Sequence, residues 1–397
     1  MRTRITLLIL ILPITALLAG CPDQSNTLID DGQINASQFD WGVPRGIPLP
    51  IEPSDNPMTE AKFELGRHLF YDARLSANNR VSCGSCHHQD KAFADGRRLP
   101  RGATDEIHPR NSQALVNVAW NASLTWGNPI LHTIEQQVVI PLFGEEPVEH
   151  GINDANKEHI LFNLEADTAY GELFSAAFPD DEHPITYQRI VQALSSFVRG
   201  LISFDSPVDR FNQGDTQAIT PAAKRGMDLF FSERLECFHC HGGYNFTNSV
   251  ADRTQFFIDR PFHNTGLYNI DGLGSYPFPN TGVHEITDRD RDMGRFRAPS
   301  LRNVAVTAPY THDGSVATLG EMIDIYAAGG RNISGGPNSG DGRMNPNKDG
   351  FVVGFTLSPA EKADLIAFLE SLTDEGFLTN PRFANPWPDS HPSQPQR

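Results

Sequence analysis

Two pentapeptides of the form C-x-x-C-H constrain this chain more than any other feature of its sequence. They are Cys83-Gly84-Ser85-Cys86-His87 and Cys237-Phe238-His239-Cys240-His241. In such a motif two thiols can bond covalently to the vinyl groups of a haem, and the histidine can ligate its iron. A single copy could instead be a redox-active C-x-x-C or half of a zinc site. Two copies, each followed at once by histidine, favour two c-type haems.

Residues 1–20 predict a lipoprotein signal peptide. Arg2 and Arg4 precede an apolar run over residues 5–18, which is too short to favour a membrane span. Small residues follow, and their ending at Cys21 resembles a bacterial lipobox, in which Cys21 becomes the lipidated first residue. Plain signal cleavage nearby is the alternative. We therefore expect an exported, periplasmic protein that is held to a membrane only by a lipid at Cys21.

Cysteine usage and charge narrow the class of protein further. Four of the five cysteines lie in the two motifs and the fifth is Cys21, so none is left for a structural disulfide. The formal net charge of -17 argues against nucleic acid and against an anionic membrane surface, which both favour a basic face. It permits a basic protein partner. Residues 21–45 begin polar and lack periodicity, which predicts a tether.

An internal repeat divides the chain into two similar halves. Thr59–Phe70 and Thr220–Phe230 share an N-cap threonine and a Gly-x-x-Leu-Phe ending, and each leads into a C-x-x-C-H motif. Apolar residues between 190 and 201 recur at helical spacing and predict a helix that closes the first half. A capping box, Ser358 to Glu361, opens the corresponding helix of the second half.

The plan of helix, haem motif, irregular loops and closing helix is that of a small cytochrome c. The loops are rich in Gly, Pro and Asn and suggest few strands. We therefore predict an all-α fold of two cytochrome c-like domains, with the haems near their interface. The expected ranges are 46–210 and 216–380, with a boundary near 206–216. A Pro-rich tail, residues 381–397, is expected on the surface.

Several segments between about Pro57 and Phe377 together resemble a known family. They are Pro109-Arg110-Asn111-Ser112, Trp126, Gln137-x3-Pro141, Pro147-Val148-Glu149, Phe262–Gly266, Phe296–Asn303 and Thr307–Gly314. The family is that of the bacterial di-haem cytochrome c peroxidases and their MauG-like relatives. Segments 124–129, 134–137 and 141–149 are similar to a subgroup, the methanobactin-associated MbnH enzymes. Those enzymes oxidise a tryptophan on a copper-binding partner protein, MbnP, to kynurenine.

The resemblance implies that the first iron has an open face. His87 would be its proximal ligand, and Ala103 occupies the position where many classical peroxidases carry a histidine that closes the other face. His88 and His108 are the nearby alternatives. His88 adjoins the proximal ligand and is badly placed to reach the opposite face. For His108 we expect a loop role or a contact with a haem propionate.

The second iron is expected to carry two protein ligands. His241 would be one, and the register counted from Thr307 places Tyr326 as the other, which resembles the MauG-like enzymes. An oxygen donor favours Fe(III) and Fe(IV), whereas a methionine thioether favours ferrous iron. Met322, one helical turn before Tyr326, is the alternative ligand.

Trp126 and Glu149 receive roles from the same resemblance. Trp126 stands where the peroxidases carry a tryptophan between the haems, and its indole could pass an oxidising equivalent between the irons; the alternative is a core aromatic residue. Glu149, with Gln137 beside it, would move a proton during O–O cleavage of hydrogen peroxide. Glu145 or Glu146 could share this task. Without the resemblance these carboxylates would be solvated surface groups.

A calcium ion commonly lies between the haems of this family. The matching ligands are the side chain of Asn111 and the backbone carbonyls of Thr307 and Pro309. Three oxygen ligands completed by water suit a hard cation. Without the resemblance, Asn111 would be merely a loop residue.

The sequence therefore predicts an oxidoreductase that uses hydrogen peroxide. We expect a bis-Fe(IV)-type state that oxidises a protein side chain by long-range electron transfer, with a tryptophan of an MbnP-like partner as the target. The alternative is a cytochrome c peroxidase supplied with electrons by a small donor protein, a cytochrome or a cupredoxin. A third possibility, a pure electron-transfer cytochrome, would require both irons six-coordinate and slow reaction with peroxide.

Overall fold

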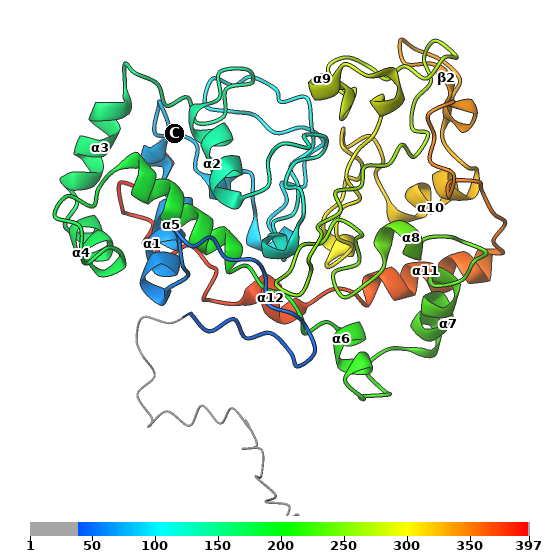
Figure 1. Cartoon of the computed structure of the whole chain (residues 1–397), viewed down its shortest axis with the longest axis horizontal. Coiled ribbons are helices and arrows are strands. Elements are labelled where there is room, and N and C mark those ends of the chain that lie inside the picture. Colours follow the sequence, from blue (N-terminus) through cyan, green and yellow to red (C-terminus); the bar gives the residue numbers. More distant parts are fainter. Residues whose placement is uncertain (1–38, 396–397) are drawn as a thin grey trace, which may run out of the picture. The chain divides into compact units, whose positions relative to one another are not determined.

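Helices joined by long irregular loops make up nearly all of the fold. The structure, a computed structural model, describes residues 39–395 (Figure 1). The predicted signal peptide, Cys21 and residues 21–38 of the predicted tether lie outside the described residues. Within residues 39–395, no helix is long and apolar enough to cross a membrane.

The first half of the described chain contains six α-helices. They are α1 (Glu60–Phe70), α2 (Ile134–Phe143), α3 (Lys157–Glu165), α4 (Thr168–Ala177), α5 (Tyr187–Arg199) and α6 (Pro207–Asn212). The second half contains α7 (Pro221–Phe230), α8 (Phe238–His241), α9 (His284–Thr287), α10 (Leu319–Ala327), α11 (Pro359–Glu370) and α12 (Glu375–Thr379). Short 3-10 turns occupy residues 73–75, 83–85, 89–91, 118–120, 290–292, 304–306 and 342–344.

The strands of the described residues form one antiparallel hairpin. β1 (Asn332–Ile333) pairs with β2 (Gly340–Asp341), with Asn332 opposite Asp341 and Ile333 opposite Gly340. The described chain is therefore mostly helical, which is consistent with the predicted all-α class.

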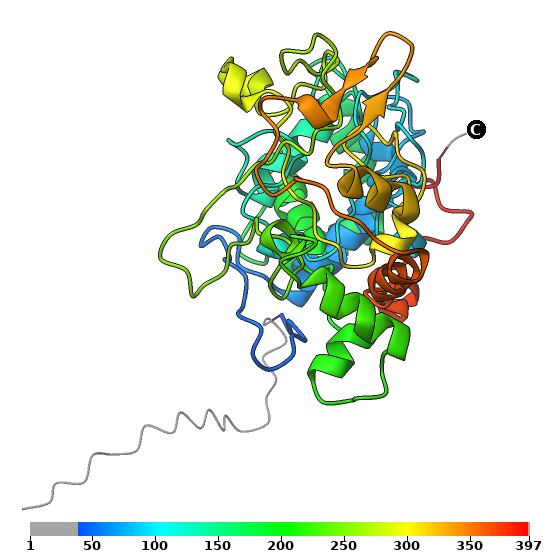
Figure 2. The same cartoon turned by 90° about the vertical axis from the view of Figure 1, so that its right-hand side faces the viewer.

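The internal repeat corresponds to two equivalent helix pairs. Thr59 and Thr220 accept hydrogen bonds at the N-termini of α1 and α7, as predicted. The closing helices α5 and α11 pack along α1 and α7 respectively (Figures 1 and 2). A Cβ atom at Gly66 would overlap the carbonyl oxygen of Ala193, and one at Gly226 would overlap that of Asp364. Glycine in the repeated Gly-x-x-Leu-Phe segment thus allows the two backbones of each pair to approach.

The apolar side chains form two main cores and one smaller cluster. The first core takes residues between Phe39 and Leu201 and, from the C-terminal segment, Phe377, Leu378, Phe383 and Trp387. The second core takes residues between Val208 and Leu372. The smaller cluster consists of Leu267, Tyr268, Tyr276 and Phe296, with Trp126 of the first half packed against it. All described residues belong to one compact unit. The predicted boundary region, 206–216, contains α6, and the exact domain ranges stay a prediction.

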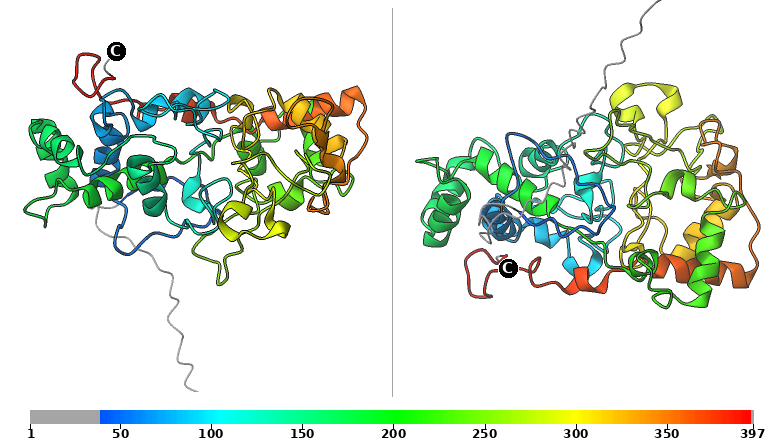
Figure 3. Two further views of the ribbon diagram at one scale, coloured as in Figure 1. Left: turned by 90° about the horizontal axis from the view of Figure 1, so that it is seen from above. Right: turned by 60° about the horizontal axis from the view of Figure 1, so that its bottom comes forward.

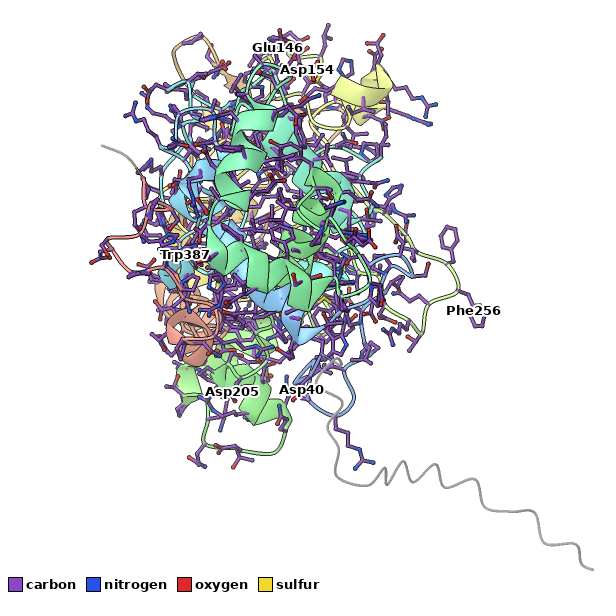
Figure 4. The ribbon with its side chains drawn as sticks, turned by 90° about the vertical axis from the view of Figure 1, so that its left-hand side faces the viewer. Asp40, Glu146, Asp154, Asp205, Phe256 and Trp387 are labelled. Atoms are coloured by element: carbon purple, nitrogen blue, oxygen red, sulfur yellow. The ribbon has the colours of Figure 1, made fainter. Side chains whose placement is uncertain are left out.

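The C-terminal segment corrects one expectation. We predicted that residues 381–397 form a surface tail, but Phe383 and Trp387 are buried in the first core. The segment runs back to the first half, close to α1 (Figure 3; Trp387 is labelled in Figure 4). The indole Nε1 of Trp387 donates to the carbonyl of His68, 2.9 Å away. The prediction was wrong because it relied on the Pro-rich composition of the segment and gave no weight to its two large apolar side chains, which favour burial.

The predicted tether, residues 21–45, is wrong at its C-terminal end for the same reason. Phe39 is buried against Phe63, with ring centroids 5.5 Å apart. Trp41 packs edge-to-face on Trp120, with centroids 6.5 Å apart. The folded part of the chain therefore includes Phe39 and Trp41.

Candidate functional site

The first C-x-x-C-H motif holds a neutral, half-buried imidazole. Residues 83–85 form a 3-10 turn after Ser82, and the backbone N–H of His87 bonds to the carbonyl of Cys83, 3.0 Å away. The Nδ1 atom of His87 lies 2.6 Å from the carbonyl oxygen of Phe93. Burial lowers the pKa of His87 to about 4. A neutral ring that donates from Nδ1 presents the lone pair of Nε2, which is the form that ligates iron.

The second motif repeats this arrangement. His241 ends α8, and its Nδ1 atom lies 3.3 Å from the carbonyl oxygen of Phe246. Burial lowers the pKa of His241 to about 4 as well. Both predicted proximal histidines are therefore neutral and can offer a nitrogen lone pair to an iron. The hydrogen bond that orients the ring is shorter at His87 than at His241.

The cysteines of both motifs are available for covalent attachment of a haem. No disulfide joins Cys83, Cys86, Cys237 or Cys240. Burial raises the pKa of Cys83, Cys86 and Cys237 to about 12. Among the described residues, the one cluster of His, Cys, Asp and Glu with metal-ligand spacing is Glu233, Glu236 and His239. It is an ion pair in which His239 Nε2 lies 2.7 Å from Glu236.

A large cavity surrounds the second motif and is lined by both halves of the chain. It contains about 1950 Å³ of space free of atoms, open solvent at its mouth included. Asn111 and Trp126 line it from the first half. Cys237, Cys240 and His241 line it from the second half. Its size, its apolar walls and its donors fit a covalently bound haem.

Arg297 supplies an independent sign that the cavity takes an anionic group. Its side chain lines the cavity, is 4% exposed, and donates to the side chain of Gln113 and to the carbonyl of Thr125. Burial lowers its pKa to about 10, and no described carboxylate contributes to that shift. A buried cation without a counter-charge is costly. The propionate groups of a haem would compensate the Arg297 charge.

Tyr326 and Met322 both line this cavity from α10. Burial raises the pKa of the Tyr326 phenol, and the nearby Cys240 and Cys237 act in the same direction. The tyrosine therefore lies near the cysteines of the second motif. Met322 lies one helical turn earlier on the same wall, so the identity of the second ligand stays a prediction based on register.

Trp126 lies where the two halves meet. Its indole Nε1 donates to the carbonyl of Asn111, 2.8 Å away, and its own carbonyl accepts from the backbone N–H of Arg297 at 2.8 Å. It lines the large cavity and packs on the cluster that contains Phe296. Gly127, next in sequence, lets the backbone approach Gly282 of the second half. This position suits a side chain between two haems.

Glu149 lies beside the first motif. Burial is the main cause of the raised pKa of Cys83, and the negative charge of Glu149 is the second. The same charge also raises the pKa of Cys86. In the chain alone its side chain is 42% exposed, yet the surrounding protein raises the pKa of the carboxyl to about 7 through burial. A haem bonded to these cysteines would cover more of this surface, which acts on the pKa in the same direction. Such a carboxyl can both accept and donate a proton near neutral pH.

Other predicted residues on this side are placed as follows. Ala103 donates its backbone N–H to the carbonyl of Glu149 at 2.7 Å, and its methyl group offers no ligand. His108 is buried, with Nε2 3.2 Å from the carbonyl of Val148 and Nδ1 3.8 Å from Glu149. His88 lies 3.8 Å from the carboxylate of Asp95.

Gln137 belongs to the same region. It lies on α2, where the carbonyl of Pro141, one turn later, accepts from the backbone N–H of His150 at 3.0 Å. The segment that carries Glu149 therefore runs beside α2. The side-chain oxygen of Gln137 is buried without a hydrogen-bond partner in the protein, as expected for a group that accepts a hydrogen bond from a water or a ligand. Glu145 and Glu146 are exposed.

The three predicted calcium ligands line the large cavity together. The side-chain nitrogen of Asn111 donates to the carbonyl of Arg97, 2.9 Å away, so its side-chain oxygen is the atom left for a cation. Thr307 and Pro309 reach the same cavity from the second half. The calcium ion itself stays a prediction.

Three buried polar residues were missed by the sequence analysis. Arg297 carries an uncompensated charge, both oxygens of Asp95 lack hydrogen-bond partners, and so does Nε2 of His312. A second repeat could have pointed to Arg297. Residues 113–119 and 299–305 have related sequences, and Asn117 and Asn303 at equivalent positions both have positive φ, 53° and 58°. This repeat places Arg297 beside a segment that lines the large cavity.

Two half-buried histidines, each after paired cysteines on a duplicated helical plan, define a class of two-haem oxidoreductase. A family described as di-haem cytochrome c peroxidase matches residues 60–217. The methylamine utilization protein MauG of Methylophilus methylotrophus is 35% identical over 336 residues, 84% of this chain and 88% of that protein. The chain belongs to this family of di-haem peroxidases and MauG proteins, and it is an oxidoreductase of that type.

Two further relatives bear on the function. The cytochrome-c peroxidase IdrP1 of Pseudomonas sp. (strain SCT) is 31% identical over 345 residues, 82% of this chain and 84% of that protein. The crystal structure of a MauG-like protein associated with microbial copper homeostasis superposes with a TM-score of 0.87 at 51% identity. The match covers 88% of this chain and all of that one, 100%. The family implies two c-type haems, hydrogen peroxide and a partner protein.

Proposed function

We propose that this enzyme uses hydrogen peroxide to oxidise a side chain of a partner protein by long-range electron transfer. The preferred target is a tryptophan of an exported, copper-binding, MbnP-like protein. The observation that carries the proposal is the difference between the two sites. Tyr326 and His241 both line the large cavity, whereas the first motif has Ala103 and the carboxyl of Glu149 nearby.

When bound, the two haems would supply the redox chemistry, including the bis-Fe(IV)-type state that the sequence predicts. The residues of the chain do the rest. Glu149 accepts the proton of bound peroxide and returns it to the departing oxygen, because its pKa of about 7 suits both steps. Gln137 orients the peroxide or a water through its unpartnered oxygen. Trp126 passes the oxidising equivalent between the halves.

Tyr326 keeps that equivalent from being consumed by an electron donor. A phenolic oxygen on the second iron favours its higher oxidation states, so this haem accepts electrons from a small donor protein poorly. Calcium bound by Asn111, Thr307 and Pro309 would fix the loops between the haems. We further propose export to the periplasm and lipid anchoring at Cys21.

Two relatives support the choice of partner. The MauG-like protein associated with copper homeostasis is 51% identical, well above the 31% of the cytochrome-c peroxidase IdrP1. A protein substrate also needs an exposed contact surface. Phe256 and Phe257, on a loop of the second half, are 109% and 82% exposed, and Figure 4 shows Phe256 projecting from that loop. Exposed neighbouring aromatic residues are typical of protein contacts.

The test uses the holoenzyme, hydrogen peroxide and an MbnP-like protein, with mass spectrometry of the partner. We expect oxygen to be added to a tryptophan of the partner. The matched variant is Tyr326→Met, which replaces the phenol by a thioether. It should lose this modification and should gain steady-state peroxide reduction with reduced cytochrome c.

The alternative, a peroxidase supplied by a small electron-transfer protein, makes the opposite prediction. The unaltered enzyme would then reduce peroxide steadily with reduced cytochrome c and would leave the tryptophans of the partner unchanged. That result, or a thioether signature of Met322 in the spectrum of the second haem, would refute the proposal.

A further inference from the structure

A thin wall separates the large cavity from a second cavity at the surface. Leu267 and His312 line the large cavity, while their neighbours in sequence, Tyr268 and Asp313, line the second one. The second cavity contains about 450 Å³ of atom-free space, open solvent included. One layer of side chains therefore divides the proposed haem site from a hollow that solvent reaches.

Tyr268 and Asp313 form a buried pair in this wall. They are 4% and 6% exposed, and the phenol of Tyr268 donates a short hydrogen bond to Oδ2 of Asp313. The other oxygen, Oδ1, accepts from the Thr311 hydroxyl at 2.6 Å and from the backbone N–H of Ser315 at 3.2 Å. Burial by itself would raise the pKa of Asp313. His312 and these hydrogen bonds outweigh it and hold the pKa at about 2, so the group is a carboxylate.

The ring of Tyr268 is also connected to the predicted electron path. It lies 5.4 Å from the ring of Tyr276 and 6.5 Å from the imidazole of His312, between centroids. His312 stacks on Phe296 at 3.7 Å. Trp126 packs against this same cluster. Aromatic side chains in contact thus lead from the tryptophan between the halves to the phenol at the second cavity.

We propose that Tyr268 is a further oxidisable residue of this enzyme, which gives one electron to the peroxide-oxidised enzyme and its phenolic proton to Asp313. The O–H bond of the phenol breaks, the carboxylic acid of Asp313 forms, and a neutral tyrosyl radical remains at the second cavity. The electron reduces by one the oxidising equivalents that peroxide left in the enzyme. The inference rests on the proposed function, which supplies the oxidant.

The neighbouring tyrosine shows why the carboxylate matters. Tyr276 is 3% exposed and lies in the same cluster, but its phenol donates to the side-chain oxygen of Asn264, 2.8 Å away. An amide oxygen is a far weaker base than a carboxylate, so it cannot take the proton when the phenol is oxidised. Tyr276 therefore provides a matched control in the same apolar surroundings.

The experiment mixes the holoenzyme with hydrogen peroxide without a partner protein and follows haem absorbance and electron paramagnetic resonance together. We expect a tyrosyl signal that narrows with ring-deuterated tyrosine. The signal should be lost in Tyr268→Phe and retained in Tyr276→Phe. In Asp313→Asn, which keeps an oxygen acceptor but not the base, it should form more slowly than in the unaltered enzyme.

The absorbance record separates the two possible failures. If peroxide does not change the haem spectrum, the proposed function fails and this inference fails with it. If the haems respond but the tyrosyl signal is absent, or persists in Tyr268→Phe, the inference alone is overturned. Loss of the signal in both tyrosine variants would also overturn it, because that result indicates disruption of the cluster.

Discussion

Burial sets the protonation states at both ends of the proposed reaction path. It makes His87 and His241 neutral by lowering their pKa to about 4, and it raises the pKa of Glu149 to about 7. The same physical cause acts in opposite directions because burial always disfavours the charged form. The chain thus prepares two neutral metal ligands and one carboxyl that changes protonation state near neutral pH.

Replacing Glu149 by glutamine tests the proton-transfer role. The base is the carboxylate, so the rate of reaction with peroxide should rise in the unaltered enzyme as the pH rises through about 7. Glu149→Gln should remove this rise and slow the reaction by roughly 10²–10⁴-fold, the usual contribution of a general acid or base. Stopped-flow haem absorbance over this pH range measures both effects.

Glu145→Gln is the matched control, because Glu145 is an exposed carboxylate a few residues away. It should leave the rate and its pH dependence unchanged. If Glu145→Gln slows the reaction while Glu149→Gln does not, the role belongs to Glu145, which the sequence left open.

Among individual residues, the sequence pointed to those that lie in motifs. It did not point to residues whose role depends on contacts between distant parts of the chain. The placements of His87, His241, Tyr326 and Trp126 follow from spacing within short segments. The role of Arg297 depends on the absence of a described carboxylate beside it, which only the folded chain reveals. The Tyr268–Asp313 pair joins residues far apart in sequence, and no local pattern announces it.

Among the helices, the two repeated glycines allow the closest approach of one backbone to another. Gly66→Ala would place a methyl group on the Ala193 carbonyl at the α1–α5 crossing. Overpacking of this kind costs ~1–3 kcal/mol, more than the ~1 kcal/mol that alanine gains over glycine in a helix. We expect Gly66→Ala to lower the free energy of unfolding of the holoprotein, measured by denaturant titration.

Gly171, within α4, is the control for this prediction. No atom lies within 4 Å of a Cβ added there. Gly171→Ala should therefore be neutral or stabilise the protein by up to about 1 kcal/mol through helix propensity. Equal effects of the two substitutions would contradict the close-approach explanation.

The sequence predicted the repeated helices well and the others poorly. Capping residues and apolar spacing marked α1, α5, α7 and α11, and the structure confirms all of them. The helices α2 to α4 were not predicted. Pro141 inside α2 and the missing side-chain cap at Asn156 of α3 weakened the local signals of these two helices. The capping box of Thr133 and Gln136 at α2 and the N-cap Asp167 of α4 were readable signals that the sequence analysis did not use. The prediction of a surface tail was wrong because the position of Trp387 is set by its burial against the distant first core and not by a local pattern.

Across the whole molecule, the halves are joined by side chains as well as by the connecting chain. Arg110 pairs with Glu285, Arg297 reaches Gln113, and the C-terminal tail returns to the first core. Arg297 and Gln113 line the proposed haem cavity, to which both halves contribute residues. Electron transfer between two haems requires a fixed separation, and these contacts supply the rigidity.

The segment that connects the halves is fixed by a buried ion pair. Asp209 of α6 accepts from both terminal nitrogens of Arg302, at 2.8 and 2.9 Å, and Arg302 is 2% exposed. Asp209→Asn would retain an acceptor for Ser206 at the helix start but would leave the Arg302 charge unpaired. Removing one partner of a buried pair costs ~3–5 kcal/mol. We expect a loss of this size in the free energy of unfolding of the holoprotein.

The dependence on pH gives an independent check of the same pair. Burial by itself would raise the pKa of Asp209, but the hydrogen bonds and charge of Arg302 outweigh it and lower the pKa. The pair therefore stabilises the fold above the unfolded-state value of about 3.9, and this stability is lost as the pH falls through the lower folded-state pKa. In Asp209→Asn, the free energy of unfolding should lack this part of its fall at low pH. The exposed pair of Lys157 and Asp154 is the control, since Asp154 is 96% exposed, and Asp154→Asn should cost far less. Equal losses in the two variants would show that burial of the charge at the junction is not what stabilises it.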